Sequence, residues 1–268
     1  MRVSRSGYYA WSKRSESARA QSDRVLLKKI RTVYDDHRGH CGAGKIWGVL
    51  KEQGVVCGRH QIARICRQHG IMARRRRRFI VTTQSKYNTW LAPNLLNRNF
   101  QVDEPDRVWV GDVTFIPTRE GFLYLAVLID LYARRVVGWS MSTHNDSLLL
   151  EAALEMALKT RDPEPGLIHH SDRGRTYGSR VYRKELAKAS VVQSMSRKGD
   201  CWDNAVAESF FATLEFELIE NQVFESRAFA RGAIFEFIEV FYNRQRAHET
   251  LGYKTPEQVE RAYQMALN

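Results

Sequence analysis

Residues 108–141 contain three segments of β-strand character in succession, and this arrangement most limits the folds open to the chain. β-Branched and aromatic residues dominate 108–116, and the segments 122–132 and 134–141 follow after only a few residues. Such short connections join antiparallel neighbours, so we expect consecutive hairpins.

Helices and strands alternate after these hairpins. Periodicity predicts a helix over 147–159, a short strand over 167–170, a helix over 180–188 and a short strand over 191–195. Two longer helices follow, over 204–220 and 227–243. Three antiparallel strands followed by this alternation predict an α/β domain with a mixed five-stranded sheet and helices on both faces. We assign it to 105–268.

The front of the chain has a helical pattern instead. Apolar residues recur at helical spacing over 23–34, around 46–50 and over 59–69, with glycines between the segments. Three short helices joined by tight turns are typical of a helix-turn-helix domain, here 23–73 behind an N-terminal arm, 1–22. The third helix would turn polar side chains suited to phosphates and base edges outward, namely Arg59, Gln61, Arg64, Arg67 and Gln68. An ordinary helical subdomain with a solvated polar face is the alternative.

The uneven charge favours DNA. Residues 1–88 hold 21 Lys and Arg against 5 Asp and Glu, whereas residues 89–268 hold 21 against 25. Like charges repel along the run Arg74, Arg75, Arg76, Arg77 and Arg78, so 74–104 is expected to be a basic linker. These arginines would either follow a phosphate backbone or remain solvated. No apolar run is long enough to span a membrane.

Three acidic residues lie where a metal-dependent active site would need them. Asp112 lies within the first strand among apolar neighbours, where a carboxylate is costly to bury unless it is paired, protonated or bound to a cation. Asp172 follows the strand over 167–170, at the kind of strand end where α/β sheets bind ligands. Glu208 lies on an apolar helix. An acid of this kind taken alone is more often a helix cap or an ion-pair partner, whereas the three together suit hard cations such as Mg²⁺.

The sequences around these acids resemble the three catalytic motifs of the retroviral-integrase (DDE) superfamily. The motifs are WVGDVTFI at 109–116, HSDRG at 170–174 and GDCWDNAVAESFF at 199–211, with 35 residues between Asp172 and Glu208. SRSGYYAW at 4–11 and the segment 241–253 further resemble the OrfB transposases of the insertion-sequence-three family of bacterial mobile elements. The resemblance covers nearly the whole chain.

This resemblance implies a ribonuclease-H-like core in which Asp112, Asp172 and Glu208 hold two Mg²⁺ ions, for which Mn²⁺ could substitute. It implies an enzyme that binds the terminal inverted repeats of an insertion sequence, frees a 3′-hydroxyl and joins it to target DNA without a covalent protein intermediate. Asn204 is a candidate for supporting the metal ligands from behind, with a local turn role as the alternative.

The same resemblance extends to partners. It implies a homo-oligomer on double-stranded DNA, in the cytoplasm on the nucleoid. The chain begins at a point that resembles the interior of a fused family product, so we expect the OrfA product, or a frameshift OrfA–OrfB fusion, to supply an upstream portion.

Several alternatives stay open. The family usually has Lys or Arg seven residues after the catalytic glutamate, but this chain has Glu215, for which Arg197 or Lys198 could compensate. Three other aspartates are potential ligands, although the last suits a helix N-cap better: Asp130, Asp200 and Asp203. The front cysteines and histidines lack zinc-ligand spacing. A DNA-binding regulator with an inactive core, or a nuclease that hydrolyses without joining, would share these features.

Overall fold

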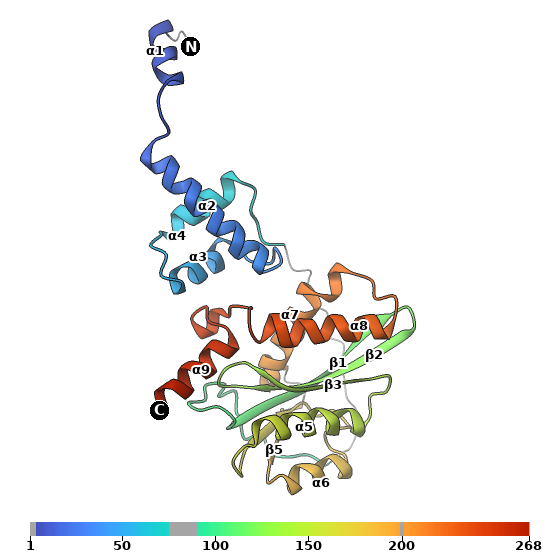
Figure 1. Cartoon of the computed structure of the whole chain (residues 1–268). Coiled ribbons are helices and arrows are strands. Elements are labelled where there is room, and N and C mark those ends of the chain that lie inside the picture. Colours follow the sequence, from blue (N-terminus) through green and yellow to red (C-terminus); the bar gives the residue numbers. More distant parts are fainter. Residues whose placement is uncertain (1–3, 75–89, 199–200, 268) are drawn as a thin grey trace. The chain divides into compact units, whose positions relative to one another are not determined.

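The computed structural model describes residues 4–74, 90–198 and 201–267, and its contacts divide the chain into two compact units, 1–74 and 75–268 (Figure 1). In the described residues, no helix is both long and apolar enough to cross a bilayer. The expected linker therefore falls partly outside the described residues, which resume at Trp90.

The first unit contains the three predicted helices, α2 (Ala18–Asp36), α3 (Ala43–Glu52) and α4 (Arg59–Gln68), preceded by α1 (Arg5–Ser12). Helix α2 begins earlier than the apolar periodicity predicts because the Ser17 hydroxyl accepts a hydrogen bond from the N–H of Ala20 and caps the helix. The predicted apolar faces form the core, which buries Leu26, Ile30, Val33, Ile46, Val49, Leu50, Ile62, Ile65 and Cys66.

The second unit is built on a five-stranded mixed sheet with the order β3-β2-β1-β4-β5. The strands are β1 (Val108–Thr118), β2 (Gly121–Asp130), β3 (Val136–Ser142), β4 (Ile168–Ser171) and β5 (Val192–Met195). The first three pair antiparallel, which confirms the predicted hairpins, whereas β4 and β5 continue the sheet in parallel with β1.

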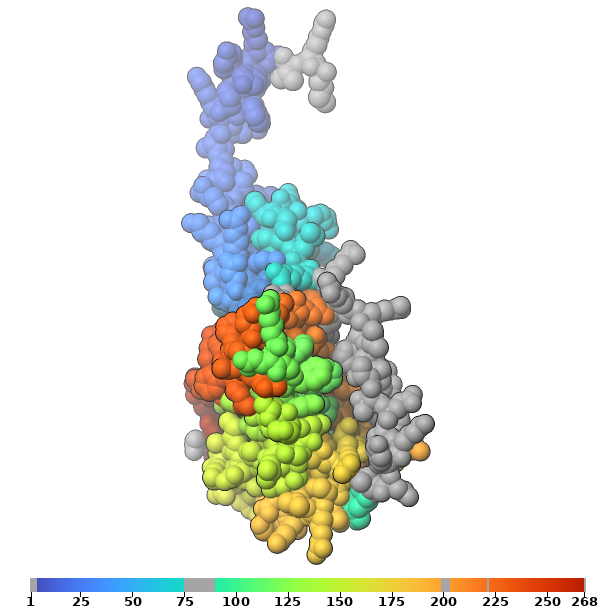
Figure 2. Space-filling view, turned by 90° about the vertical axis from the view of Figure 1, so that its right-hand side faces the viewer, coloured from blue at the N-terminus to red at the C-terminus, as the bar shows by residue number. Residues whose placement is uncertain are grey.

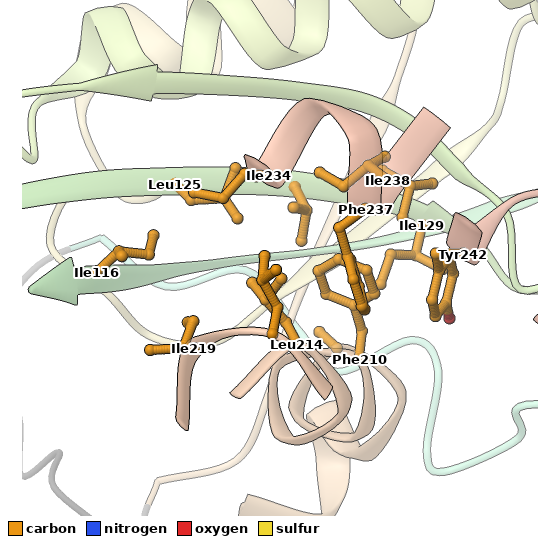
Figure 3. Packing of buried hydrophobic residues seen from close by; sticks show 14 of the residues in the cluster. Ile116, Leu125, Ile129, Phe210, Leu214, Ile219, Ile234, Phe237, Ile238 and Tyr242 are labelled. Atoms are coloured by element: carbon orange, nitrogen blue, oxygen red, sulfur yellow. The ribbon is translucent and has the colours of Figure 1, made fainter. Parts of the chain in front are cut away.

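Helices cover both faces of the sheet, as predicted (Figure 1). One face packs against α7 (Ala205–Glu217), α8 (Arg227–Phe235) and the π-helix η3 (Glu236–Tyr242). Figure 3 shows this core, in which Ile116 and Leu125 of the sheet meet Phe210, Leu214 and Phe237 of the helices. The other face packs against α5 (Ser147–Arg161) and α6 (Arg180–Lys188), which lie next to one another (Figure 2).

The structure differs from the sequence prediction at the end of the second unit. The predicted helix over 227–243 changes to π-helical geometry after Phe235, and the unpredicted α9 (Pro256–Leu267) follows. Short 3₁₀ turns complete the unit: η1 (Cys201–Asn204), η2 (Ile219–Asn221) and η4 (Glu249–Leu251). Ion pairs help to hold α9, because its Glu260 pairs with Arg135 at 3.0 Å and with Arg161 at 2.9 Å. The ring of Tyr263 also packs edge-on against Tyr132.

Residues 90–104, which were expected to be part of the linker, pack against the rest of the second unit. Ala92 and Leu96 are buried in it, and the backbone N–H of Leu95 donates to the hydroxyl of Ser194 at 2.9 Å. This segment passes beside β5 before β1 begins.

Candidate active site

Asp112, within β1, and Asp172, the residue directly after β4, lie next to each other because β1 and β4 are paired. Strands β1 and β4 are parallel with Gly111 opposite Ser171, and each aspartate is the next residue along the chain. Side chains at paired positions point to the same face of a sheet, so both carboxylates face the layer of α7. Asp172 Oδ1 accepts a hydrogen bond from the N–H of Gly174 at 2.8 Å, and a Cβ atom at 174 would crowd that oxygen at 2.8 Å.

Glu208 comes from the helix layer that covers this face. It lies in the first turn of α7, whose apolar residues are buried against β1. The Nδ2 amide of Asn204 donates to the carbonyl of Gly111 at 3.3 Å, so the start of α7 is bonded to the residue before Asp112. Asn204 is 3% exposed, and its Oδ1 atom has no hydrogen-bond partner within the described part of the chain.

The three carboxylates interact electrostatically. Burial raises the pKa of Asp112 well above its ordinary value, and the charges of Asp172 and Glu208 add to this while the N–H of Val113 opposes it. Burial raises the pKa of Asp172 against the opposing bond from Gly174. Burial and the charge of Asp172 raise the pKa of Glu208. The carboxylates therefore repel one another, and a cation between them would turn this repulsion into attraction.

The chemistry of this donor set fits a hard divalent cation. Carboxylate oxygens are the ligands that Mg²⁺ prefers, and each of the three residues is half-buried. Across residues 4–74, 90–198 and 201–267, no three His, Cys, Asp or Glu side chains stand close enough together to hold one ion. Binding would therefore require the three side chains to turn toward one another.

Two buried histidines of β4, His169 and His170, support the strand that leads to Asp172. The ring of His169 lies over Gly111, where an added Cβ atom would be 2.5 Å from Cε1, and its Nε2 is hydrogen-bonded to the Tyr182 hydroxyl at 2.9 Å. His170 bonds the Ser194 hydroxyl at 2.8 Å. Burial lowers the pKa of both histidines to about 4, so both are neutral at pH 7. In the sequence, the only sign of this supporting role is that the two histidines come shortly before Asp172.

The N-cap expectation for Asp203 is wrong. Asn204 occupies the cap position of α7 without a side-chain cap bond, and the carboxylate of Asp203 instead binds Arg197 and Arg98. Asp130 is also engaged elsewhere, since it accepts backbone N–H bonds from Asp106 and Ala133. Asp200 lies outside the described residues.

The expected DNA-reading helix is α4, and its polar side chains are not all turned outward. Arg59 and Arg67 are exposed, as predicted. Gln61 and Arg64 are half-buried, because Asp23 of α2 accepts from Gln61 at 3.0 Å and from Arg64 at 2.7 Å. The expectation that all of these side chains face solvent is therefore wrong for two of them. Arg74 lies in the described part of the chain, and Arg75, Arg76, Arg77 and Arg78 lie outside it.

Glu215 lies two helical turns beyond Glu208 and is half-buried. Burial raises the pKa of its carboxyl, and the charge of Glu220 raises it further. Of the two basic residues considered as compensation, Arg197 is bound to Asp203 and Lys198 is exposed. The helix that carries Glu208 thus has a second acid at the position where the family usually has Lys or Arg.

Family models match three parts of the chain. Residues 102–201 and 189–256 each match a model described as "Integrase core domain", and residues 20–79 match one described as "HTH-like domain". The matched ranges include parts of both units.

Curated relatives match along most of their length. The "Insertion element IS600 uncharacterized 31 kDa protein" of Shigella sonnei is 42% identical over 98% of this chain and 97% of the relative. The "Transposase for insertion sequence element IS904" of Lactococcus lactis is 40% identical over 88% of this chain and 94% of the relative. "Transposase InsF for insertion sequence IS3A" of Escherichia coli is 37% identical over 97% of this chain and 91% of the relative.

Among solved structures, the HTLV-2 integrase catalytic core domain in complex with magnesium has a TM-score of 0.43 at 17% identity, covering 58% of this chain and 96% of that one.

Proposed function

The chain belongs to the IS3 family of insertion-sequence transposases, and we propose that it cleaves the terminal inverted repeats of a bacterial element and joins the freed 3′ ends to target DNA. The observation that carries this proposal is the interaction of three carboxylates, which are Asp112 of β1, Asp172 directly after β4, and Glu208 of α7. They come from the two integrase-core matches.

The residues Asp112, Asp172 and Glu208 would hold two Mg²⁺ ions, or Mn²⁺ in their place. When bound, two divalent ions favour attack on a phosphodiester and stabilise the oxygen that leaves. The chain's own contribution is to fix the donors: the backbone pairing of β1 with β4 sets the separation of the two aspartates, and the Asn204 bond to Gly111 sets the start of the helix that carries Glu208. Asn204 is thus proposed to support the ligands from behind.

No protein nucleophile is needed for this reaction. Water attacks first and frees a 3′-hydroxyl on the element's end; that hydroxyl then attacks a phosphodiester of the target, and a target 3′ oxygen leaves. One phosphodiester forms for each one broken in the joining step, so the chain requires neither an energy source nor a covalent intermediate.

We place the DNA contacts of the front domain on α4 and on the arginine run. Arg59 and Arg67 are exposed and suited to phosphates. The run Arg74, Arg75, Arg76, Arg77 and Arg78 offers the same side-chain chemistry. Gln61 and Arg64 can read base edges only by exchanging their bonds to Asp23 for bonds to DNA. The domains proposed are the arm 1–22, whose last residues belong to α2, the helix-turn-helix 23–73, the linker 74–104, whose residues 90–104 pack on the core, and the core 105–268.

The proposal extends to partners. Two element ends and a target must be handled together, so we propose a homo-oligomer assembled on double-stranded DNA, working on the nucleoid in the cytoplasm. The OrfA product, or an OrfA–OrfB fusion, is the proposed source of the remaining sequence-specific contacts.

A strand-transfer assay tests the proposal. Labelled duplexes that carry the element's ends are incubated with the full chain and a target plasmid, with Mg²⁺ or with EDTA. We expect cleaved and joined products with Mg²⁺ only, and their loss with Asp112→Asn, Asp172→Asn or Glu208→Gln, while end binding persists.

The matched control is Asp146→Asn, which removes a carboxylate from the same unit at the N-cap of α5, where Asn caps equally well. It should retain full joining. Hydrolysis without joining would instead identify a nuclease, and binding without either product would identify a regulator. Joining near the parent rate in any one triad variant would remove that residue from the site.

A further inference from the structure

Asp23, in the first half of α2, connects side chains of α4 that were expected to read DNA. Helices α2 and α4 pack against each other in the first unit (Figure 1). One carboxylate oxygen, Oδ1, accepts a hydrogen bond from Gln61 Nε2 at 3.0 Å, and the other, Oδ2, accepts from Arg64 Nη2 at 2.7 Å. Arg64 Nη1 also donates to Gln68 Oε1 at 3.1 Å. A single acid thus lies at the centre of a network that includes three side chains of α4.

This network makes the middle of the polar face of α4 electrically neutral. The hydrogen bond from Gln61, followed by the bond and charge of Arg64, holds the pKa of Asp23 below its ordinary value, so the acid is ionised at pH 7. Its negative charge cancels the positive charge of Arg64, whose side chain is only 31% exposed. The charge of Arg19 has a smaller effect on the same acid. Asp23 and Arg64 therefore form an ion pair on the face that α4 would present to DNA.

This ion pair limits which groups of DNA can bind Arg64. A free arginine on a helix that faces DNA would bind a nearby phosphate of any duplex, because phosphates occur at every base step. A phosphate that approached Arg64 would also approach the negative charge of Asp23, which opposes it. The edge of a guanine is uncharged and offers two acceptors, O6 and N7, that suit a guanidinium. The exposed side chains of Arg59 and Arg67 supply phosphate contacts instead.

We propose that Asp23 determines sequence specificity in the first unit, because it holds Arg64 back from phosphates and leaves it to bind an uncharged base edge. The proposal rests on the proposed function, which places DNA contacts on α4. Asp23 acts through Arg64 and is therefore a positioning residue that does not itself bind DNA. It lowers the affinity for unrelated DNA more than the affinity for an element end.

The test compares the binding of the full chain to two duplexes across a range of salt concentrations. One duplex carries an element end and the other has an unrelated sequence, and both are measured in EDTA so that no strand is cut. With Asp23→Asn, Arg64 is released to bind a phosphate, so the slope of log affinity against log salt on the unrelated duplex should become steeper by about 0.9. The affinity ratio between the two duplexes should fall by about five- to tenfold, the lower end of what one base contact discriminates.

Further variants show whether Asp23 acts through Arg64. In a chain that already carries Arg64→Gln, adding Asp23→Asn should leave the slope on the unrelated duplex unchanged, because no arginine is released. Asp36→Asn is the matched control, since it removes an exposed carboxylate from the last turn of the same helix, and it should change neither the slope nor the ratio. Asp23→Glu keeps the negative charge and should keep the parent slope even if the melting temperature falls.

An unchanged slope with Asp23→Asn overturns the proposal, and so does an equal steepening with Asp36→Asn or Asp23→Glu. Steepening that persists in the Arg64→Gln chain also overturns it, because a general loss of negative charge or the nearby Arg19 would then be the cause. The result is independent of strand transfer, since the assay contains no metal. Arg67→Gln tests the placement of DNA on α4 separately: a shallower slope with this variant, without the Asp23 effect, would reject the role of Asp23 and leave α4 as a DNA-binding helix.

Discussion

The side-chain amide of Asn204 is hydrogen-bonded to the carbonyl of Gly111, 3.3 Å away, across 93 residues of sequence. This bond joins the start of α7 to β1 at the residue directly before Asp112. Two of the three proposed metal ligands are therefore positioned relative to each other through one side chain that does not itself bear a charge.

Replacing Asn204 should reduce catalysis more than DNA binding. With Asn204→Ala, the helix start is no longer fixed to β1, and we expect joining to fall by about 10- to 100-fold, as is typical when support behind a metal ligand is lost. End binding should change by less than about twofold. The measurement is joining rate against Mg²⁺ concentration, where the variant should need more Mg²⁺. Asn94→Ala, which removes an amide bonded to Asp203 instead, serves as the comparison; an equal Mg²⁺ requirement in both variants would contradict the assignment.

Asp130 predicts a pH dependence of stability. Burial raises its pKa to about 7 in the folded state, against an ordinary value of 3.8. A raised folded-state pKa contributes stability that is fully present below the unfolded-state value and is lost as pH rises through about 7. The loss is on the order of 4 kcal/mol as an upper bound.

Thermal unfolding of the parent and of Asp130→Asn from pH 5 to pH 8.5 checks this. The asparagine cannot ionise, so its stability relative to the parent should rise with pH and level off above about pH 8. A difference that is constant across this range would show that the carboxyl of Asp130 titrates near its ordinary pKa.

We expect the charge of Glu215 to lower the affinity of the chain for duplex DNA. It lies on α7 two turns beyond Glu208, and its charge opposes an approaching phosphate. We expect Glu215→Lys to bind duplex DNA more tightly, with a salt slope steeper by about 0.9 if one phosphate contact is gained. Glu155→Lys, on an exposed face of α5, is the matched charge reversal. Equal steepening in both variants would mean that only net charge matters.

The arginine run should act on affinity and leave sequence preference unchanged. Replacing the five residues 74–78 by Ala in the full chain should make the salt slope shallower by up to about four units, if the run follows a phosphate backbone. The affinity ratio between an element end and an unrelated duplex should change little, since phosphate contacts carry no sequence information. A changed ratio with an unchanged slope would place these side chains away from the backbone.

The elements that sequence patterns predict well are those with a strong local signal. The apolar periodicity of the front helices and the alternation along β1 place the cores of both units correctly, with Ile30, Ile62 and Val110 fully buried. The three carboxylates stand on the predicted elements because their immediate neighbours define a strand, a strand end and a packed helix.

Long-range polar contacts could not be predicted in this way. Asp203 suits an N-cap by its local sequence, yet Arg98, which lies 105 residues earlier, accounts for part of its environment. Helix α9 was missed because it docks through Glu260 on Arg135 and Arg161 and buries little apolar surface. Gln61 and Arg64 look solvent-facing on a helical wheel, but Asp23 of a neighbouring helix binds both. In each case the partner lies on an element whose position only the fold defines.

The pairing of Gly111 with Ser171 also determines which mutations in β1 leave the enzyme active. The distance between the two aspartates is set by hydrogen bonds between main-chain atoms, and these bonds do not depend on the side chains. Apolar residues near Asp112 can therefore be replaced by similar apolar residues without loss of activity. A single inserted or deleted codon in 108–111 is different. It turns Asp112 to the opposite face of the sheet, toward α5, while leaving composition and hydrophobicity almost untouched. Copies of such an element should therefore be inactivated by short frame-preserving indels in β1 far more readily than by substitutions there.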